Sequence, residues 1–187
     1  MGKIVLVTGG ARSGKSRFAE KYAAKYGQNV AYIATAEIQD EEMRYRVSLH
    51  RSRRPSAWQT YEAPLDAHIA LKEAGRQHDF ILFDCLTLYM SNLLCTMEKL
   101  EDTGAVYALL QDKIQLLLQC AKQNSGTALF VTNEVGDSIV PQNALSRLYR
   151  DMAGLANQWM AEAADEVYLV TCGIPVNIKK LSQAWRE

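Results

Sequence analysis

The sequence lacks an excess of charge of either sign. Lys and Arg total 21, Asp and Glu total 21, and the formal net charge is zero. A protein that binds nucleic acid through its phosphates usually carries a basic excess, so this balance argues against nucleic acid as a partner. A net charge of zero is nevertheless compatible with a local basic segment. With 187 residues, 48% of them hydrophobic, the chain can bury a sizeable core, and we expect residues 1–187 to form one domain.

The sequence is also poor in cysteine and in long apolar segments. Its four cysteines include no C-x-x-C pair. This excludes the common zinc sites and a small disulfide-based domain, and we expect buried, reduced thiols. No segment approaches the roughly 18 apolar residues of a membrane span, and the N-terminus has no signal-peptide pattern. We therefore expect a cytoplasmic protein without a membrane span.

Short apolar runs alternate with helical patterns along the chain. We expect strands at residues 3–9, 29–36, 79–85, 127–134 and 166–173, a sixth strand at 175–180, and helices at 14–27, 40–50, 64–75, 105–123 and 143–164. Strands separated by helices need crossover connections, which produce a mostly parallel sheet covered on both faces. The expected fold class is therefore α/β, with helices on both faces of the sheet.

Residues 9–16 read GGARSGKS, which matches the phosphate-binding pattern G-x-x-x-x-G-K-[ST]. Glycines let backbone N–H groups wrap a phosphate, Lys15 bridges the β- and γ-phosphates, and Ser16 holds Mg²⁺. A predicted strand precedes the motif and an amphipathic helix follows it, which is the context that this chemistry requires. We therefore expect a nucleoside triphosphate to be bound by Gly9, Gly10, Ala11, Arg12, Ser13, Gly14, Lys15 and Ser16.

Polar residues end two other predicted strands. Asp84 ends the run FILFD, where phosphate-loop proteins place a carboxylate that holds Mg²⁺. The alternative role is a helix N-cap, and the two roles can coexist. Asn133 and Glu134 end the strand at 127–134, at the edge where open α/β sheets bind ligands. They either contact substrate or cap the next turn.

A basic loop surrounds one of the three histidines. Five arginines lie around His50: Arg44, Arg46, Arg51, Arg53 and Arg54. Arginine binds phosphate oxygens bidentately, and a histidine among such arginines can act as a general base or attack phosphorus itself. From the residues alone, a solvated basic helix end or a nucleic-acid contact is an equally good interpretation. We expect His68 and His78 to be surface or packing residues.

Further motifs occur together with the phosphate motif: YIATA (32–36), HRSRRPSAW (50–58), VTNEVG (131–136), IVPQN (139–143), RLYRDMAGLAN (147–157) and ADEVYLVTCGIP (164–175). With VLVTGGARSGKS (5–16), the set resembles the bifunctional adenosylcobinamide kinase/adenosylcobinamide-phosphate guanylyltransferase family of cobalamin biosynthesis. The resemblance covers nearly the whole chain. It implies a RecA-like P-loop fold, adenosylcobinamide and its phosphate as substrates, and a homotrimer.

The resemblance implies two reactions. ATP or GTP first phosphorylates the aminopropanol hydroxyl of adenosylcobinamide. GTP then reacts with that phosphate, through a guanylate bound covalently to His50, to give adenosylcobinamide-GDP and pyrophosphate. Ser16 and Asp84 are the implied Mg²⁺ ligands, and Glu62 is implied to read the guanine edge. The implied nucleotide site also includes Thr35, Ala36, Glu37, Arg51, Ser52, Arg53, Arg54 and Asp84.

Two other interpretations compete with this one. An ordinary small-molecule P-loop kinase without guanylyltransferase activity explains the phosphate loop and Asp84, but it gives the basic segment around His50 no role. A GTP-dependent switch or a nucleic-acid-binding ATPase rests on the arginines alone. Guanine switches commonly carry an N/T-K-x-D motif, which is absent from this sequence.

Overall fold

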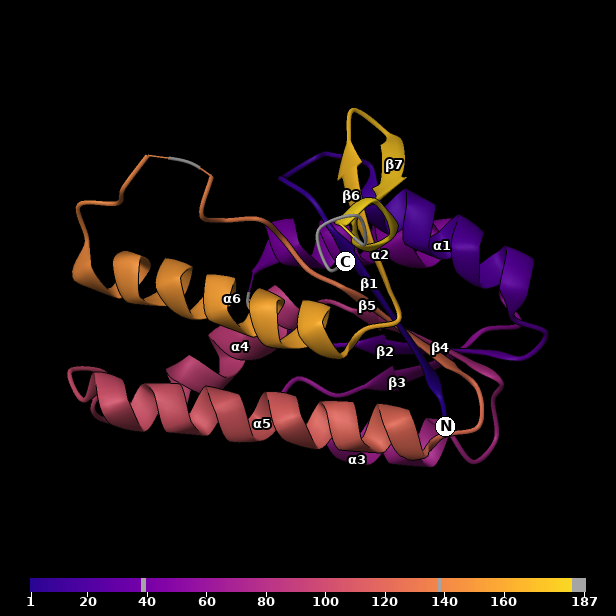
Figure 1. Ribbon diagram of the computed structural model, residues 1–187, viewed down its shortest axis with the longest axis horizontal. Helices are drawn as coiled ribbons and strands as arrows, with labels where there is room; N and C mark the ends of the chain where they lie inside the picture. The colour runs from indigo at the N-terminus through magenta and orange to yellow at the C-terminus, as the bar shows by residue number, and fades with distance from the viewer. Residues whose placement is uncertain (38–39, 138, 183–187) are drawn as a thin grey trace.

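In the computed structural model, which describes residues 1–37, 40–137 and 139–182, a seven-stranded sheet has the order β3-β2-β4-β5-β1-β6-β7 (Figure 1). Its strands are β1 (Lys3–Thr8), β2 (Val30–Ala34), β3 (Gln59–Glu62), β4 (Phe80–Asp84), β5 (Thr127–Val131), β6 (Glu166–Thr171) and β7 (Ile174–Asn177). Neighbouring strands are parallel except for β6 and β7, which form an antiparallel hairpin. The mostly parallel sheet expected from the sequence is confirmed.

Helices cover both faces of this sheet. They are α1 (Lys15–Tyr26), α2 (Glu41–Arg53), α3 (Ala67–Ala74), α4 (Leu86–Cys95), α5 (Thr103–Gln123), α6 (Ala144–Ala163) and α7 (Ile178–Leu181). Along β1, Ile4 and Leu6 pack with buried residues of α3, α4, α5 and α6, whereas Val5 and Val7 pack with α1. Successive side chains of a strand point to opposite faces, so a strand buried on both sides is apolar throughout.

Three parts of the chain differ from the expectation. The sixth strand, expected at 175–180, ends at Asn177, and residues 178–181 form helix α7 instead. The edge strand β3 has the sequence QTYE and is largely exposed, so it lacks the apolar run that indicates a buried strand. Helix α4 follows β4 directly and is mostly buried. Its N-cap position is Cys85, without a side-chain cap hydrogen bond. The alternative role of Asp84 as the N-cap of this helix is therefore wrong.

The cysteines only partly match the expectation. All four are free; Cys85 is buried, Cys120 is half-buried, and Cys95 and Cys172 are exposed. Burial raises the pKa of the Cys85 thiol to about 11, with the nearby Asp84 contributing in the same direction, so this thiol is protonated at neutral pH. The expectation of buried thiols is wrong for Cys95 and Cys172.

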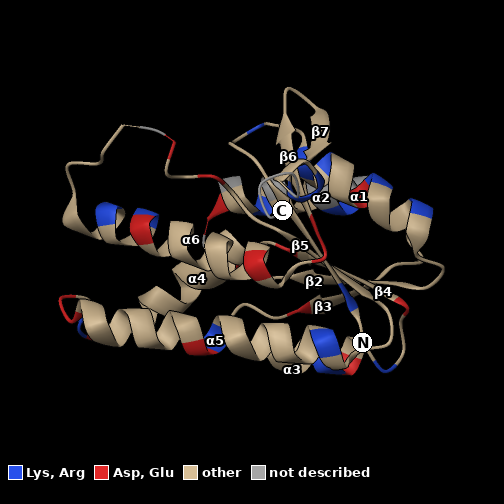
Figure 2. Cartoon of the chain, viewed as in Figure 1, with Lys and Arg blue, Asp and Glu red and all other residues tan. Residues whose placement is uncertain are grey.

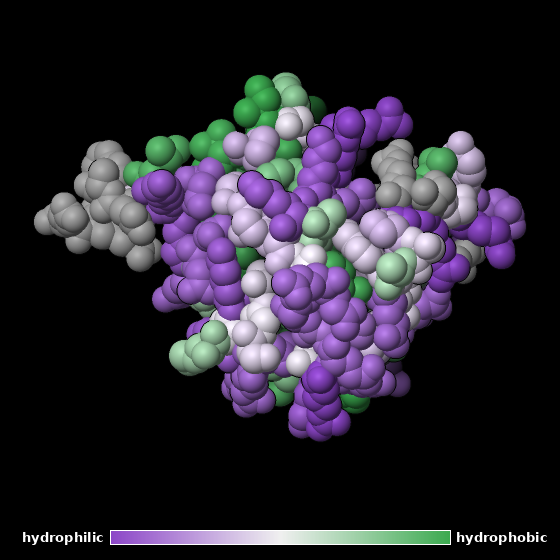
Figure 3. All heavy atoms as spheres, turned by 90° about the vertical axis from the view of Figure 1, so that its right-hand side faces the viewer, coloured by the Kyte–Doolittle hydropathy of each residue, from purple (hydrophilic) through white to green (hydrophobic). Residues whose placement is uncertain are grey.

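The surface in Figure 3 is largely hydrophilic, and apolar atoms gather at its top, where the β6–β7 hairpin lies. Ile174 and Val176, both in β7, are 65% and 41% exposed. Across the described residues, no helix combines the length and the apolar character that crossing a bilayer requires.

Lys179, in α7, caps the end of α6. Its Nζ donates to the carbonyl oxygens of Ala161 (2.7 Å), Glu162 (3.0 Å) and Ala164. The last carbonyls of a helix lack partners within it and carry the negative end of its dipole. Lys179→Met should therefore lower the free energy of unfolding by about 1–2 kcal/mol, measured by chemical denaturation. Lys180→Met, at an exposed neighbour, is the control, and equal stability of both variants would contradict the capping role.

Candidate functional site

The phosphate loop joins β1 to α1 in a conformation that requires its glycines. A Cβ atom on Gly9 would lie 2.4 Å from the Val170 carbonyl oxygen of β6. Gly14 occupies the N-cap position of α1 with a φ of 94°, in the left-handed region that other residues rarely adopt. The Gly10 carbonyl accepts a hydrogen bond from the Ser13 N–H at 3.2 Å, which closes the loop. The loop therefore has the compact form expected of a phosphate cradle.

Lys15 begins α1 and folds back over this loop. Its Nζ donates to the Gly10 carbonyl oxygen at 3.1 Å, and only 9% of the residue is exposed. Burial lowers the pKa of Lys15, although the negative charge of Asp84 opposes this shift. A cation on a largely buried side chain interacts strongly with an anion because the local dielectric constant is low. The position suits a lysine that binds phosphate.

The turn between β6 and β7 packs against the phosphate loop, which the sequence motifs did not indicate. Cys172 and Gly173 form this two-residue turn, and both have positive φ, as in type I′ hairpin turns. The Gly173 N–H donates to the Ser13 carbonyl at 2.8 Å. A Cβ on Gly14 would lie 3.0 Å from the Gly173 Cα. The hairpin thus supports the loop from the side of β6.

Asp84 lies at the carboxyl end of β4, on the same edge of the sheet as the phosphate loop. The Tyr32 hydroxyl of β2 donates to Asp84 Oδ2 at 3.0 Å, and the Arg54 guanidinium lies 3.5 Å from the centre of the Tyr32 ring. Burial raises the pKa of Tyr32 well above its usual value, with the charge of Asp84 adding to the effect, so this hydroxyl remains a donor. The structure thus links Arg54 and Asp84, two predicted site residues, through a tyrosine that sequence reasoning missed.

Thr35 follows β2 and joins its end to the end of β4. Its hydroxyl donates to the Cys85 carbonyl and accepts from the Cys85 N–H, both at 2.8 Å, and the residue is fully buried. Asn92 of α4 donates to the Thr35 carbonyl at 2.7 Å. Thr35 therefore holds two strand ends together, and the assignment of Thr35, Ala36 and Glu37 to the nucleotide site stays a prediction.

The basic segment around His50 is helical rather than a loop. It forms the last turns of α2, of which residues 42, 46, 50, 52 and 53 are described by their backbone alone. Cations near a helix C-terminus interact favourably with its dipole, which explains why α2 continues past residue 50 to Arg53. The side chains of His50, Ser52 and Arg53 thus lie outside the description. Lys and Arg are prominent on α1 and α2 in Figure 2.

Two of the predicted nucleotide-site residues contact one another. Arg51, in α2, forms an ion pair with Glu62 at the end of β3. Both side chains are more than half exposed, so the pair contributes less than about 1 kcal/mol to stability. An exposed pair of this kind is readily exchanged for contacts with a ligand.

The ends of β4 and β5 are also connected. Asn133 Nδ2 donates to the Thr87 hydroxyl at 2.9 Å, and that hydroxyl lies 3.0 Å from the Cys85 Sγ. Tyr149 of α6 donates to the Thr87 carbonyl at 3.0 Å. Asn133 therefore ties β5 to α4 rather than capping the turn that follows it. Thr87 belongs to no motif, and Tyr149 lies in the motif at 147–157 without a role assigned to it, so sequence reasoning did not select them.

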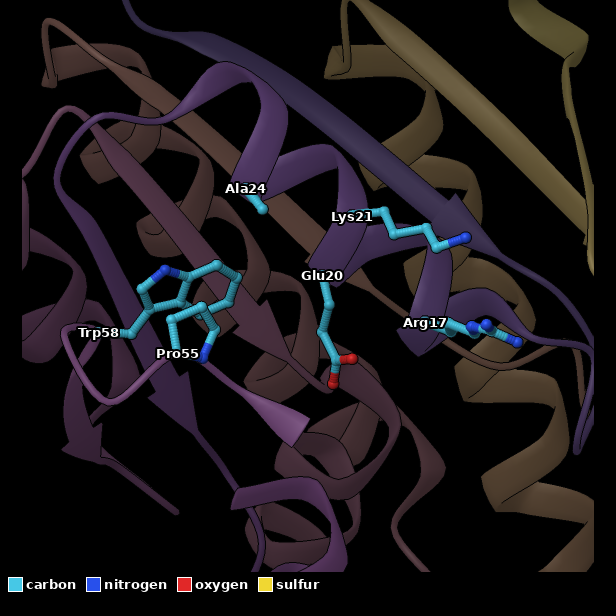
Figure 4. A pocket seen from close by; sticks show the side chains of 6 residues that line it. All are labelled: Arg17, Glu20, Lys21, Ala24, Pro55 and Trp58. Atoms are coloured by element: carbon cyan, nitrogen blue, oxygen red, sulfur yellow. The ribbon is translucent and has the colours of Figure 1, made fainter. Parts of the chain in front are cut away.

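A pocket opens on the outer face of α1, close to the phosphate loop (Figure 4). Its walls come from α1 and from the segment that follows α2: Arg17, Glu20, Lys21, Ala24, Pro55 and Trp58. Arg17 lies only two positions after Lys15 of the phosphate loop. The Trp58 ring offers an apolar wall, and α1 contributes charges of both signs. Sequence reasoning missed this pocket because its two walls are distant in the chain.

The residues at the loop offer oxygen ligands for a metal ion. Among the residues that the structure describes, no group of three or more His, Cys, Asp or Glu side chains could enclose a metal. Mg²⁺ does not need such a cage, because it is usually held by one or two protein oxygens together with substrate phosphates and water. The Ser16 hydroxyl and the Asp84 carboxylate are chemically suited to that arrangement.

The chain is similar to proteins of one family along most of its length. Residues 5–178 match the family model described as cobinamide kinase / cobinamide phosphate guanyltransferase. The bifunctional adenosylcobalamin biosynthesis protein CobU of Salmonella typhimurium is 44% identical over 181 residues, which cover 94% of this chain and 99% of that protein. CobP of Pseudomonas aeruginosa, named in the same way, is 40% identical over 93% of this chain and 96% of its own.

A solved ATPase of a type III secretion system from pathogenic bacteria has a similar fold. Its TM-score is 0.59 at 13% sequence identity, and the match covers 95% of this chain but only 57% of that one. At this identity the likeness concerns the fold alone, and it agrees with the expected P-loop α/β architecture. The sequence comparisons show more than the fold. The chain belongs to the cobinamide kinase / cobinamide phosphate guanyltransferase family.

Proposed function

We propose that this chain is a bifunctional enzyme of cobalamin biosynthesis that phosphorylates adenosylcobinamide and then transfers guanylate to the phosphate product. The observation that carries the proposal is the family match over residues 5–178, which spans the phosphate loop, α2 and the strand ends. The names of the relatives state a bifunctional role in adenosylcobalamin biosynthesis. We assign both reactions to a single domain, residues 1–187.

In the first reaction, the phosphate loop binds ATP or GTP. Its backbone N–H groups and the N-terminus of α1 surround the β-phosphate, and Lys15 neutralises charge that develops on the γ-phosphate. Ser16 and Asp84 would hold Mg²⁺, which when bound neutralises phosphate charge. The position of Lys15 over the Gly10 carbonyl supports this assignment.

In the second reaction, His50 is the nucleophile. An imidazole nitrogen attacks the α-phosphorus of GTP, the bond to the bridging oxygen breaks, and pyrophosphate leaves. An oxygen of adenosylcobinamide phosphate then attacks the same phosphorus and the P–N bond breaks, which gives adenosylcobinamide-GDP. Arg51, Arg53 and Arg54 neutralise charge in both transfers. Support comes from Arg51, which α2 brings to Glu62 at the end of the edge strand β3.

The test is turnover of adenosylcobinamide with ATP and GTP supplied separately. ATP alone should yield adenosylcobinamide phosphate, and GTP should carry the reaction on to adenosylcobinamide-GDP with release of pyrophosphate. Phosphorylation without guanylyl transfer would favour the alternative, a small-molecule P-loop kinase. Absence of both products would contradict the proposal.

A homotrimer is the remaining part of the proposal. Several large apolar side chains are exposed around the start of α6 and on the C-terminal hairpin and helix: Ile139, Val140, Leu145, Ile174, Val176 and Leu181. Exposed apolar side chains of this size are typical of subunit interfaces, and either group is a candidate surface for the contact. Sedimentation equilibrium should give three times the chain mass of 21.0 kDa. A sample that stays at the mass of one chain would contradict the trimer.

A further inference from the structure

Glu134 stands immediately beside the phosphate loop. It follows β5, which pairs in parallel with β1 so that Val131 lies opposite Val7. Its N–H donates to the carbonyl oxygen of Gly9, the first glycine of the loop, at 3.2 Å. The backbone of Glu134 is therefore fixed to the loop that would hold the transferred phosphate.

Two donors orient the Glu134 carboxylate. The hydroxyl of Thr8, the residue before Gly9, donates to Glu134 Oε1, and Asn157 Nδ2 of α6 donates to the same oxygen at 3.3 Å. Among the described residues, no hydrogen bond or ion pair engages Glu134 Oε2. One oxygen is thus anchored within the protein, while the other is left for an additional donor.

The anchor of this carboxylate is itself rigid. Asn157 is only 8% exposed, its Oδ1 accepts from the Thr132 hydroxyl at 2.7 Å, and its Nδ2 also donates to the Asn133 carbonyl at 3.1 Å. A buried amide with these partners stays in place and holds the carboxylate with it. Asn157 is a polar residue on the otherwise apolar inner face of α6, where a polar side chain needs such partners.

Other carboxylates on this edge of the sheet are farther away or otherwise engaged. Strands lie roughly 4.8 Å apart, so β2 and β3, which carry Glu37 and Glu62 at their ends, lie about 14 and 19 Å from β1. Asp84 accepts from Tyr32 and is the proposed metal ligand. On the other side of β1, the residues that end β6 include no carboxylate. Glu134 is thus the carboxylate that follows β5, the strand next to the loop.

We propose that Glu134 is the general base of the phosphoryl-transfer reaction. The hydroxyl oxygen of the substrate attacks the γ-phosphorus, the bond from that phosphorus to the bridging oxygen breaks, and the nucleoside diphosphate leaves. The hydroxyl proton passes to Glu134 Oε2, while Thr8 and Asn157 hold Oε1. This assignment rests on the proposed function and adds to it the group that receives the proton.

The test is Glu134→Gln in the full-length protein. A glutamine keeps an Oε1 that accepts from Thr8 and Asn157, but its amide cannot take up the proton. The kcat for phosphorylation of adenosylcobinamide by ATP should fall by about 100-fold or more. The KM for either substrate should change less than about twofold, because the lost interaction is made only in the transition state. Covalent labelling by α-labelled GTP and the thermal midpoint should both match the unaltered protein.

Asp137→Asn, on an exposed carboxylate three residues away, is the matched control and should phosphorylate at the unaltered rate. If Glu134→Gln also retained the full kcat, the assignment would be overturned. It would be overturned equally if the variant lost thermal stability, GTP labelling and phosphorylation together, since that pattern means a structural role. Failure of the unaltered protein to phosphorylate would reject the proposed function and this assignment with it.

Discussion

Replacement of His50 by alanine is expected to abolish covalent guanylylation of the protein. Without the imidazole, no protein group attacks the α-phosphorus of GTP, so formation of adenosylcobinamide-GDP should fall by a factor on the order of 10⁵, as when other enzymes lose a covalent nucleophile. Phosphorylation of adenosylcobinamide should continue, because that reaction takes place at the phosphate loop. The measurement is incubation with α-labelled GTP, followed by counting of protein-bound label that is stable to alkali and released by acid.

His78→Asn is the matched control for this variant. His78 lies at the amino end of β4, opposite to the edge that carries the phosphate loop, and its Nδ1 contacts the Ala74 carbonyl at 3.1 Å. Asparagine can maintain that contact, so labelling should be unchanged. Full guanylyl transfer by His50→Ala would reject the covalent mechanism. Loss of phosphorylation together with labelling would show that His50 serves the whole site and not one step.

Lys15→Ala should produce the second large effect, on the phosphoryl transfer. The ammonium group sits over the Gly10 carbonyl, and only 9% of the residue is exposed. Its charge therefore acts on the γ-phosphate in a medium of low dielectric constant, and its loss should reduce kcat/KM for phosphorylation by about 10³-fold. Steady-state rates with ATP as the varied substrate measure this change.

Lys25→Ala is the control, because Lys25 is exposed near the other end of the same helix. The variant tests whether loss of any positive charge on α1 has the same effect, and we expect its rate to match the unaltered protein. If Lys15→Ala kept more than about a tenth of the activity, the phosphate loop would not be the site of phosphoryl transfer. Circular dichroism of both variants excludes unfolding as the cause of a lost rate.

Central elements of the fold were predictable because each carries a local signal. The run KIVLVT at β1 and the run FILFD at β4 are apolar because both faces of these strands are buried. Edge strand β3 was not predicted, because the side chains of its sequence, QTYE, are mostly exposed and form no apolar run. The end of α2 was placed too early, since a run of basic residues resembles a solvated loop until the helix dipole is considered.

The candidate site was predictable only in part, for a similar reason. Gly9, Gly14 and Lys15 lie in one continuous motif whose spacing is dictated by the phosphate that it wraps. Tyr32 and Thr8 lie within quoted motifs, but the motifs give them no role, and their roles follow from partners that are distant in the chain, Asp84 and Glu134. A single threonine or tyrosine at a strand end has no distinguishing pattern.

The sequence by itself determined the phosphate loop, the alternation of strands and helices, and the family, because each depends on residues close together or on motifs in a fixed order. Only the tertiary structure decided that β5 lies between β4 and β1, and hence that Glu134, Thr8 and Asn157 meet beside the loop. Strand order minimises the free energy of burying both faces of the whole sheet. That quantity is a sum over distant contacts, and no short stretch of sequence contains it.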